Sequence, residues 1–261
     1  MTNTERVSLT SVVLLLAMAA GCDDLSLNGT DTTPELKARG MVYILPGIQG
    51  VDSHYTNIRN GLRGAGLQCA IMIHPWGSQI PGLGLLTNET DTVADRDWGH
   101  TIAGDIAQYQ RDYPGERIYI IGQSGGGGVA VFTAEALAGM GADPIDGLIL
   151  LDASLSADYN LSTALSATKN GIVNFYNLDD TAMLETGTGM FGNVDGGHGD
   201  SAGRTGLRSS ASNVFNVQVR ADMISAFVDP HFADTSAAFT TRYIAPWILE
   251  RSWPPHSVQA D

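Results

Sequence analysis

Short apolar runs alternate along this chain with longer stretches in which apolar residues recur at helical spacing. Most of the runs are apolar at nearly every position, which is typical of strands covered on both faces. The predicted strands are Met41–Leu45, Cys69–His74, Arg117–Gly122, Gly147–Leu151, Gly171–Tyr176 and Val214–Val219. The predicted helices are Tyr55–Gly64, Trp98–Tyr113, Val129–Met140 and Ser236–Arg251. This alternation predicts an α/β protein with a mostly parallel central sheet, helices on both faces and ligands at the carboxyl ends of the strands.

The first 21 residues have the pattern of an export signal. Arg6 precedes the apolar run Val12–Ala20, which is shorter than the roughly 20 apolar residues that span a bilayer. The residues Ala19-Ala20-Gly21-Cys22 resemble the lipobox of bacterial lipoproteins, although Ala19 stands where Leu is usual. The resemblance implies that Cys22 is lipidated and holds the protein in the cell envelope, its only membrane attachment; ordinary secretion is the alternative.

The remaining chain divides into a tether and one domain. Residues 22–40 are mostly polar and include Gly29 and Pro34, which predicts a flexible tether. Residues 41–261 have the length of a single α/β domain. With Cys22 lipidated, Cys69 is the remaining cysteine, so no intrachain disulfide is expected. Gly187–Gly206 is rich in Gly, Asp, Ser and Thr and is predicted to be a long loop.

Composition narrows the possible partners. The 14 basic and 28 acidic residues give a net charge of −14, and the isoelectric point is near 4.6. Such a charge repels polyanions, which argues against nucleic acid and phosphate-rich substrates. Acidic surfaces also serve solubility alone, so the charge does not point to a particular ligand.

The strongest chemical signal follows the third predicted strand. Gly122-Gln123-Ser124-Gly125-Gly126 contains G-x-S-x-G, and an apolar helix follows it. A serine at this strand–helix junction sits on a sharp, strained turn, where side chains two residues away on either side would collide. The turn exposes the hydroxyl, and the helix N-terminus favours developing negative charge. Ser124 is therefore the candidate nucleophile.

A second motif, Leu45-Pro46-Gly47-Ile48-Gln49-Gly50, closes the first predicted strand. With the serine motif it makes the chain resemble the α/β-hydrolase superfamily, whose loop after this strand often reads H-G-x-x-G; Pro46 stands where His is common. The resemblance covers most of residues 41–251. It implies the α/β-hydrolase fold, a serine esterase or lipase-like activity without cofactor, and an oxyanion hole formed by the N–H groups of Ile48 and Gly125.

The resemblance also implies a carboxylate and then a histidine after the serine in chain order. Three acids follow strands: Asp152, Asp179 and Asp180. The family places its acid a few residues beyond the strand, which favours Asp180, while Asp179 and Asp152 stay open. His54, His74 and His100 precede the serine. His231 lies between the last strand and the last helix, where the family has its base, and is favoured over His198 in the Gly/Asp-rich loop.

No metal site is expected, because Asp195, His198 and Asp200 are possible ligands without a characteristic spacing. The connection 152–170 is too short for a bulky cap domain, and Pro75–Leu86 is either a loop that overhangs the pocket or a packed surface loop. The short connection favours a modest-sized carboxylic ester as substrate, and the net charge of −14 favours a neutral one.

Two other classes of function remain open. Gly125–Ala130 also satisfies the dinucleotide-binding pattern G-x-G-x-x-A, with Asp152 near the position of a ribose-binding acid, which would indicate an oxidoreductase. Against this, the glycines come after two earlier strands instead of the first strand. The third class is a non-catalytic lipoprotein that keeps the hydrolase fold for binding.

Overall fold

The architecture is known from a computed structural model that describes residues 31–77, 92–180, 192–224, 229–250 and 252–258. Its centre is a six-stranded sheet with the order β2-β1-β3-β4-β5-β6, and every neighbouring pair of strands is parallel. The strands are β1 Met41–Leu45, β2 Ala70–Ile73, β3 Ile118–Gln123, β4 Gly147–Leu151, β5 Ile172–Tyr176 and β6 Val214–Gln218.

The two faces of the sheet bury separate hydrophobic clusters, because successive side chains of a strand point to opposite faces. Met41, Tyr43 and Leu45 belong to one cluster, and Val42 and Ile44 belong to the other. All residues of β1, β3 and β4 are buried, as the unbroken apolar runs predict. The sequence-based prediction of a mostly parallel sheet covered on both faces is thereby confirmed.

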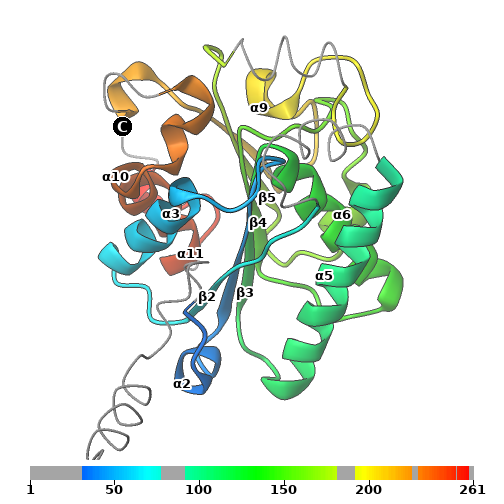
Figure 1. The fold of residues 1–261 in the computed structure, drawn as a ribbon, viewed down its shortest axis with the longest axis vertical. Helices are drawn as coiled ribbons and strands as arrows, with labels where there is room; N and C mark the ends of the chain where they lie inside the picture. The colour runs from blue at the N-terminus through cyan, green and yellow to red at the C-terminus, as the bar shows by residue number, and fades with distance from the viewer. Residues whose placement is uncertain (1–30, 78–91, 181–191, 225–228, 251, 259–261) are drawn as a thin grey trace, which may run out of the picture.

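Figure 1 shows how the helices cover the sheet. Helices α5 Thr92–Asp112 and α6 Gly125–Met140 lie on one face, and α3 Ser53–Gly64, α10 Ala237–Phe239 and α11 Ala245–Leu249 lie on the other. The remaining short helices are α2 Pro34–Lys37, α7 Ser162–Ser166 and α9 Ala202–Thr205, and α9 lies within the predicted loop 187–206. The 3-10 segments are η2 Ala221–Met223, η3 Pro230–Thr235 and η5 His256–Val258, and the π-helical turn is η4 Thr240–Ile244.

The tether prediction is wrong for its last ten residues, 31–40. Asp31 exchanges two backbone hydrogen bonds with Ile71, and its carboxylate accepts from the Arg63 guanidinium at 2.6 Å. Thr33 caps helix α2 and Pro34 opens it. Local composition suggested flexibility, but contacts with β2 and α3 order this segment.

Three helices also differ clearly from their predicted form. Helix α5 begins at Thr92, six residues before the predicted start at Trp98. Helix α6 begins at Gly125 instead of Val129. The four glycines 125–128 form its first turn, and they pack so closely on neighbouring segments that the helix can form there only without side chains. The single helix expected over Ser236–Arg251 is divided into α10, the π-helical turn η4 and α11, with Pro246 in the first turn of α11. The carboxyl-terminal part of this face is therefore a chain of short turns packed on α3.

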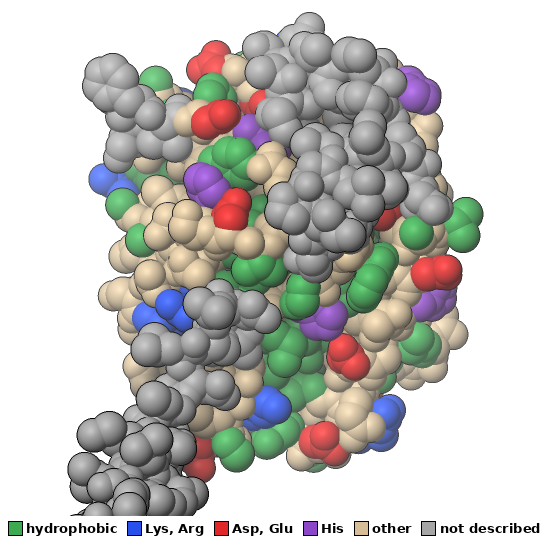
Figure 2. Space-filling model, viewed as in Figure 1, with side chains coloured by type: hydrophobic (Ala, Val, Ile, Leu, Met, Phe, Trp, Pro, Cys, Tyr) green, Lys and Arg blue, Asp and Glu red, His purple; other side chains and the backbone are tan. Residues whose placement is uncertain are grey.

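In the described part of the chain, no helix combines the length and apolar character needed to cross a membrane. The acidic side chains on the face shown in Figure 2 are scattered and do not gather in one patch. The negative charge is thus distributed widely over this face.

Candidate active site

Ser124 lies between β3 and α6 with backbone angles that L-residues rarely adopt, φ 52° and ψ −124°. The close packing that imposes this turn is visible at the two flanking glycines. A Cβ atom on Gly122 would lie 2.3 Å from the Gly126 carbonyl oxygen, and one on Gly126 would lie 2.3 Å from the carbonyl oxygen of Leu45. Neither space admits a side chain, so the strand, the turn and the helix can approach only with glycine at both positions.

The loop after β1 packs directly against this turn. A Cβ atom on Gly125 would lie 2.7 Å from Ile48 Cγ2 and 3.2 Å from the Trp76 ring. The Trp76 indole N–H donates to the Pro46 carbonyl at 2.5 Å, which fixes the ring over the loop. Ile48 and Gly125, the two residues predicted to supply oxyanion-hole N–H groups, are thus neighbours at the N-terminus of α6.

A buried histidine–carboxylate pair lies in the loops beyond β5 and β6. His231 Nδ1 is 2.5 Å from Asp180 Oδ2, and the side chain of each residue is 2% exposed. A carboxylate only accepts hydrogen bonds, so Nδ1 carries the proton and Nε2 of the neutral ring is left as an acceptor. Of the other two candidate acids, Asp179 is exposed and Asp152 is fully buried.

A turn at the end of β5 positions Asp180. The Asn177 carbonyl accepts from the Asp180 N–H at 3.2 Å, and the Asn177 side chain accepts from the Asp179 N–H at 3.0 Å. The same side chain donates to the Pro230 carbonyl at 3.0 Å. Asn177 thereby joins the loop of the acid to the loop of the histidine.

The loop of His231, which is the 3-10 helix η3, is held on two further sides. Asp229 caps it by accepting from the His231 N–H at 3.0 Å. His54 of α3 forms a 3.0 Å hydrogen bond with Thr235 and stacks on Phe232 with 4.2 Å between ring centres. The histidines that precede the serine in the sequence therefore include one that supports the site, while His74 pairs with Asp105 and His100 is exposed.

Two more carboxyl groups are buried beside this pair. Asp152 and Asp234 are both 0% exposed, and no hydrogen-bond partner reaches the carboxyl oxygens of either within the described residues. Burial raises the pKa of Asp152 well above its ordinary value, and the charges of Asp234 and Asp180 raise it further. Burial, followed by the charge of Asp180, likewise raises the pKa of Asp234. These two groups retain their protons at a pH where an exposed aspartate has lost its own.

Asp152, Asp180 and His231 form a group of potential metal ligands in the described part of the chain, with ligand atoms within 4.8 Å of one another. Two ligands of one zinc ion each lie about 2.0–2.2 Å from the metal, on different sides of it. The 2.5 Å contact between His231 and Asp180 is too short to admit an ion between them. Asp195 and Asp200 are engaged elsewhere, with the Ser156 N–H and with Arg208, and His198 is exposed.

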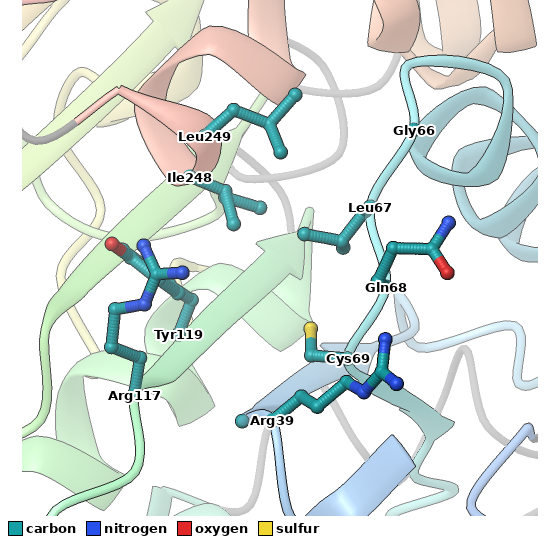
Figure 3. Close-up of a pocket in the computed structure, with 10 residues that line it drawn as sticks. Arg39, Gly66, Leu67, Gln68, Cys69, Arg117, Tyr119, Ile248 and Leu249 are labelled. Carbon is teal, nitrogen blue, oxygen red and sulfur yellow. The ribbon is translucent and has the colours of Figure 1, made fainter. Parts of the chain in front are cut away.

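A cavity of about 200 Å³ lies at the opposite, amino-terminal end of the strands. Figure 3 shows the Cys69 thiol at its base between Arg39 and Arg117, with Ile248 and Leu249 of α11 across from Leu67. Burial raises the pKa of the Cys69 thiol to about 11, which keeps it protonated and a poor nucleophile. This cavity is remote from Ser124 and supplies no alternative catalytic centre.

Four residues of the site were not identified from the sequence: Tyr55, Trp76, Gln123 and Asp234. Gln123 carried a detectable signal, since it is a polar residue at the end of a buried apolar strand. Tyr55 and Trp76 look like ordinary core aromatics in a helix and after a strand, and Asp234 looks like a helix cap. Of the segment Pro75–Leu86, for which an overhanging loop and a packed surface loop were both open, residues 78–86 lie outside the described chain, and Trp76 belongs to its described beginning.

Comparison with known proteins gave structural similarity alone. No protein-family model and no curated protein match the chain. Esterase PE8 is 14% identical with a TM-score of 0.45, over 80% of this chain and 96% of that structure. The Bacillus licheniformis lipase BlEst2 in mature form is 13% identical with a TM-score of 0.45, over 80% and 91%. The RedJ thioesterase of Streptomyces coelicolor is 13% identical with a TM-score of 0.41, over 84% and 88%. All three similarities are too weak to carry an argument about the activity of this chain.

Proposed function

We propose that this protein is a serine hydrolase that cleaves carboxylic esters through an acyl-enzyme. The observation that carries the proposal is the position of a strained serine turn beside a buried histidine–carboxylate pair. Gln123, the residue before Ser124, donates from its side chain to the carbonyl of His231 at 3.1 Å. The strand end that presents the serine is therefore in direct contact with the loop that presents the histidine, although 107 positions separate Ser124 from His231 in the chain.

In the proposed mechanism, Ser124 Oγ attacks the ester carbonyl and His231 Nε2 takes the hydroxyl proton. Asp180 holds the ring in the tautomer that leaves Nε2 unprotonated, and it stabilises the imidazolium that forms. The imidazolium then protonates the leaving alkoxide, and the acyl group remains on Ser124. Water repeats the sequence, with His231 first as base and then as acid, and releases the carboxylic acid.

Negative charge on the carbonyl oxygen would be stabilised by the N–H groups of Ile48 and Gly125. Gly125 is the first residue of α6, and N–H groups in the first turn of a helix point out along its axis without partners in the helix. The positive end of the helix dipole adds to the same effect. This assignment is supported by the close packing of Ile48 on Gly125.

We propose a neutral ester of modest size as the substrate. The net charge of −14 disfavours anionic substrates by long-range repulsion. The connection 152–170 contains the five-residue helix α7 and no cap domain, so little protein is available there to enclose a long acyl chain. An alkoxide leaves more readily than an amine, which favours esters over amides. A series of p-nitrophenyl esters of increasing chain length tests this, and a clear preference for long chains would contradict it.

A fluorophosphonate probe tests the proposed nucleophile directly. The probe should label the wild-type protein on Ser124, and Ser124→Ala should abolish labelling and leave at most roughly 10³-fold catalysis over water. Ser154→Ala is the matched control, because Ser154 is 1% exposed and its hydroxyl has no hydrogen-bond partner in the described structure. His231→Ala should be as damaging as loss of the serine, whereas His198→Ala should be mild. Full labelling of Ser124→Ala would overturn the assignment.

The packing of the glycines argues against the dinucleotide-binding alternative. A Cβ atom on Gly128 would lie 2.0 Å from Val194, and Gly125 is covered by Ile48 and Trp76. The Cα sides of these glycines contact protein, so the close backbone approach that the glycines of a dinucleotide-binding motif give a pyrophosphate group is occupied by side chains. Asp152 is 0% exposed and cannot reach a ribose hydroxyl. The non-catalytic alternative is separated from a hydrolase by the same probe, which would not label a binding protein.

We also propose that the protein is exported and attached to the cell envelope through Cys22, which lies outside the described residues. The supporting features are the apolar run Val12–Ala20 and the residues Gly21-Cys22 that follow it. Metabolic labelling with a fatty acid should mark the wild type, and Cys22→Ser should remove the label and release the protein or block its maturation. Absence of label in the wild type would favour simple secretion.

A further inference from the structure

A continuous set of buried hydrogen bonds joins the three loops of the proposed active site. The Gly47 N–H donates to the Tyr55 hydroxyl at 2.7 Å, and that hydroxyl donates to Gln123 Oε1 at 3.0 Å. Gln123 Nε2 then donates to the His231 carbonyl at 3.1 Å. Tyr55 and Gln123 are both 0% exposed, so water does not compete for these bonds.

The direction of every bond in this set is determined by its two ends. A backbone N–H such as that of Gly47 can only donate, and a backbone carbonyl such as that of His231 can only accept. The Tyr55 hydroxyl has one proton, which must go to Gln123 because its other contact is the donating Gly47 N–H. The amide group of Gln123 is therefore oriented with its oxygen towards Tyr55 and its nitrogen towards His231.

Three residues of this hydrogen-bonded set are next to, or are themselves, residues with a proposed role in the reaction. Gly47 precedes Ile48, Gln123 precedes Ser124, and the third bond ends on His231 itself. The fit at Gly47 is tight as well, since a Cβ atom there would lie 2.7 Å from Gln123 Oε1 and 3.2 Å from Ser124 Cβ. Movement of one of these loops would stretch a bond to the next.

From this geometry we propose that Tyr55 and Gln123 are positioning residues that hold the oxyanion loop, the serine turn and the histidine loop in one fixed arrangement. This inference rests on the proposed function. With no exposed surface, neither side chain can contact a substrate. They act through Ile48 and His231, whose distances from the reacting carbonyl they set. Misplacement of an oxyanion-hole donor weakens binding of the transition state more than binding of the substrate.

Tyr55→Phe removes the hydroxyl and leaves the Gly47 N–H and Gln123 Oε1 without their partner. We expect kcat for a p-nitrophenyl ester to fall roughly tenfold to a hundredfold, with KM changed by less than about twofold. The affinity for an alkylboronic acid, which forms a tetrahedral adduct on the serine, should fall by a similar factor. Gln123→Leu loses both bonds of the amide and should lower the boronic acid affinity at least as much as Tyr55→Phe does.

Tyr109→Phe is the matched control for loss of a buried tyrosine hydroxyl. Tyr109 is 5% exposed and donates to the Lys37 carbonyl at 2.5 Å. It lies near the carboxyl-terminal end of α5, far from Ser124. This variant should lose stability as Tyr55→Phe does, but keep wild-type kcat and boronic acid affinity. If Tyr55→Phe loses stability but keeps wild-type kcat and boronic acid affinity, the role of Tyr55 is structural and the inference is wrong.

A spectroscopic measurement tests the inference independently of turnover. The proton between His231 and Asp180 should give a far-downfield NMR resonance, and we expect Gln123→Leu to shift or broaden it while Tyr109→Phe leaves it in place. An unchanged resonance in Gln123→Leu would overturn the connection to His231. Failure of the wild type to react with the fluorophosphonate probe would instead overturn the proposed function, and the resonance would still report whether Gln123 positions the histidine.

Discussion

The buried carboxyl group of Asp234 makes a sharp prediction about stability and pH. Asp234 lies on η3, three residues after His231, with no exposed surface and no hydrogen-bond partner for its carboxyl oxygens in the described structure. Its pKa in the folded protein is raised by burial and by the charge of Asp180. In the unfolded chain the group titrates near the ordinary aspartate value of about 3.9. The folded protein therefore holds a proton over a pH range in which the unfolded chain has released it.

The sign and size of the effect follow from this difference in bound protons. A carboxyl with a raised folded pKa contributes stability that is fully present below the unfolded pKa and is lost as pH rises through the folded pKa. One proton corresponds to about 1.4 kcal/mol of unfolding free energy per pH unit. Asp234→Asn should therefore gain stability relative to wild type by about 1.4 kcal/mol per pH unit from about pH 4 upwards, until the folded carboxyl ionises.

Urea denaturation followed by circular dichroism at a series of pH values from about 4 to 8 measures this slope. The slope is the informative quantity, because the offset between Asp and Asn includes unrelated packing terms. Asp222→Asn is the control with a flat response: a hydrogen bond from Arg220 lowers the pKa of that exposed carboxyl, so its contribution changes only as pH falls below about 4, and the difference from wild type should stay nearly constant over this series. A difference between wild type and Asp234→Asn that stays constant with pH would refute the reasoning. So would a variant that becomes relatively less stable as pH rises.

Three further predictions concern the turn, the acid and the loop that carries Trp76. Gly126→Ala should prevent folding or severely lower the unfolding temperature, because no side chain fits there. The control is Gly139→Ala on the same helix: its Cβ atom meets no atom within 4 Å, and thermal denaturation should show the protein stabilised by about 0.5–1 kcal/mol. Asp180→Asn should lower kcat about 10⁴-fold through the wrong histidine tautomer, and Asp179→Asn should leave steady-state kinetics unchanged. Trp76→Phe loses one hydrogen bond to the oxyanion loop and should lower kcat/KM roughly tenfold without loss of fluorophosphonate labelling.

The sheet could be predicted because its information is local. Strands such as β1 and β3 are buried on both faces, so each appears in the sequence as an unbroken apolar run with a turn after it. The serine turn could be predicted for a similar reason, since the steric requirement at Gly122 is against Gly126 and acts within five residues. Asp180 and His231 were harder, because their candidacy depended on a resemblance in chain order and loops separate them.

The errors occur where contacts between distant segments decide the structure. Residues 31–40 have the composition of a linker, yet Asp31 pairs with Ile71 and Arg63, which no local pattern reveals. The helix expected over 236–251 is broken where Gly61 of α3 packs against Thr240. The approach is so close that a Cβ atom on Gly61 would lie 2.5 Å from the Cβ atom of Thr240. The periodicity of residues 236–251 is correct as a record of burial, but it does not reveal how closely α3 approaches.

The same distinction explains why Gln123 and Asp234 were not identified. Sequence reasoning assigns a role to a residue by its type and its neighbours, and a glutamine before the serine or an aspartate after the histidine fits several roles. Their importance in the structure comes from what faces them: Gln123 joins Tyr55 to the His231 carbonyl, and Asp234 lies in the field of Asp180. Gln123 is the last residue of β3 and Asp234 lies on η3, so the two approach the histidine–carboxylate pair from segments that are far apart in the sequence. Candidates for the proposed reaction can thus be chosen from a motif and from chain order, whereas the residues that hold such candidates in place depend on the folded contacts.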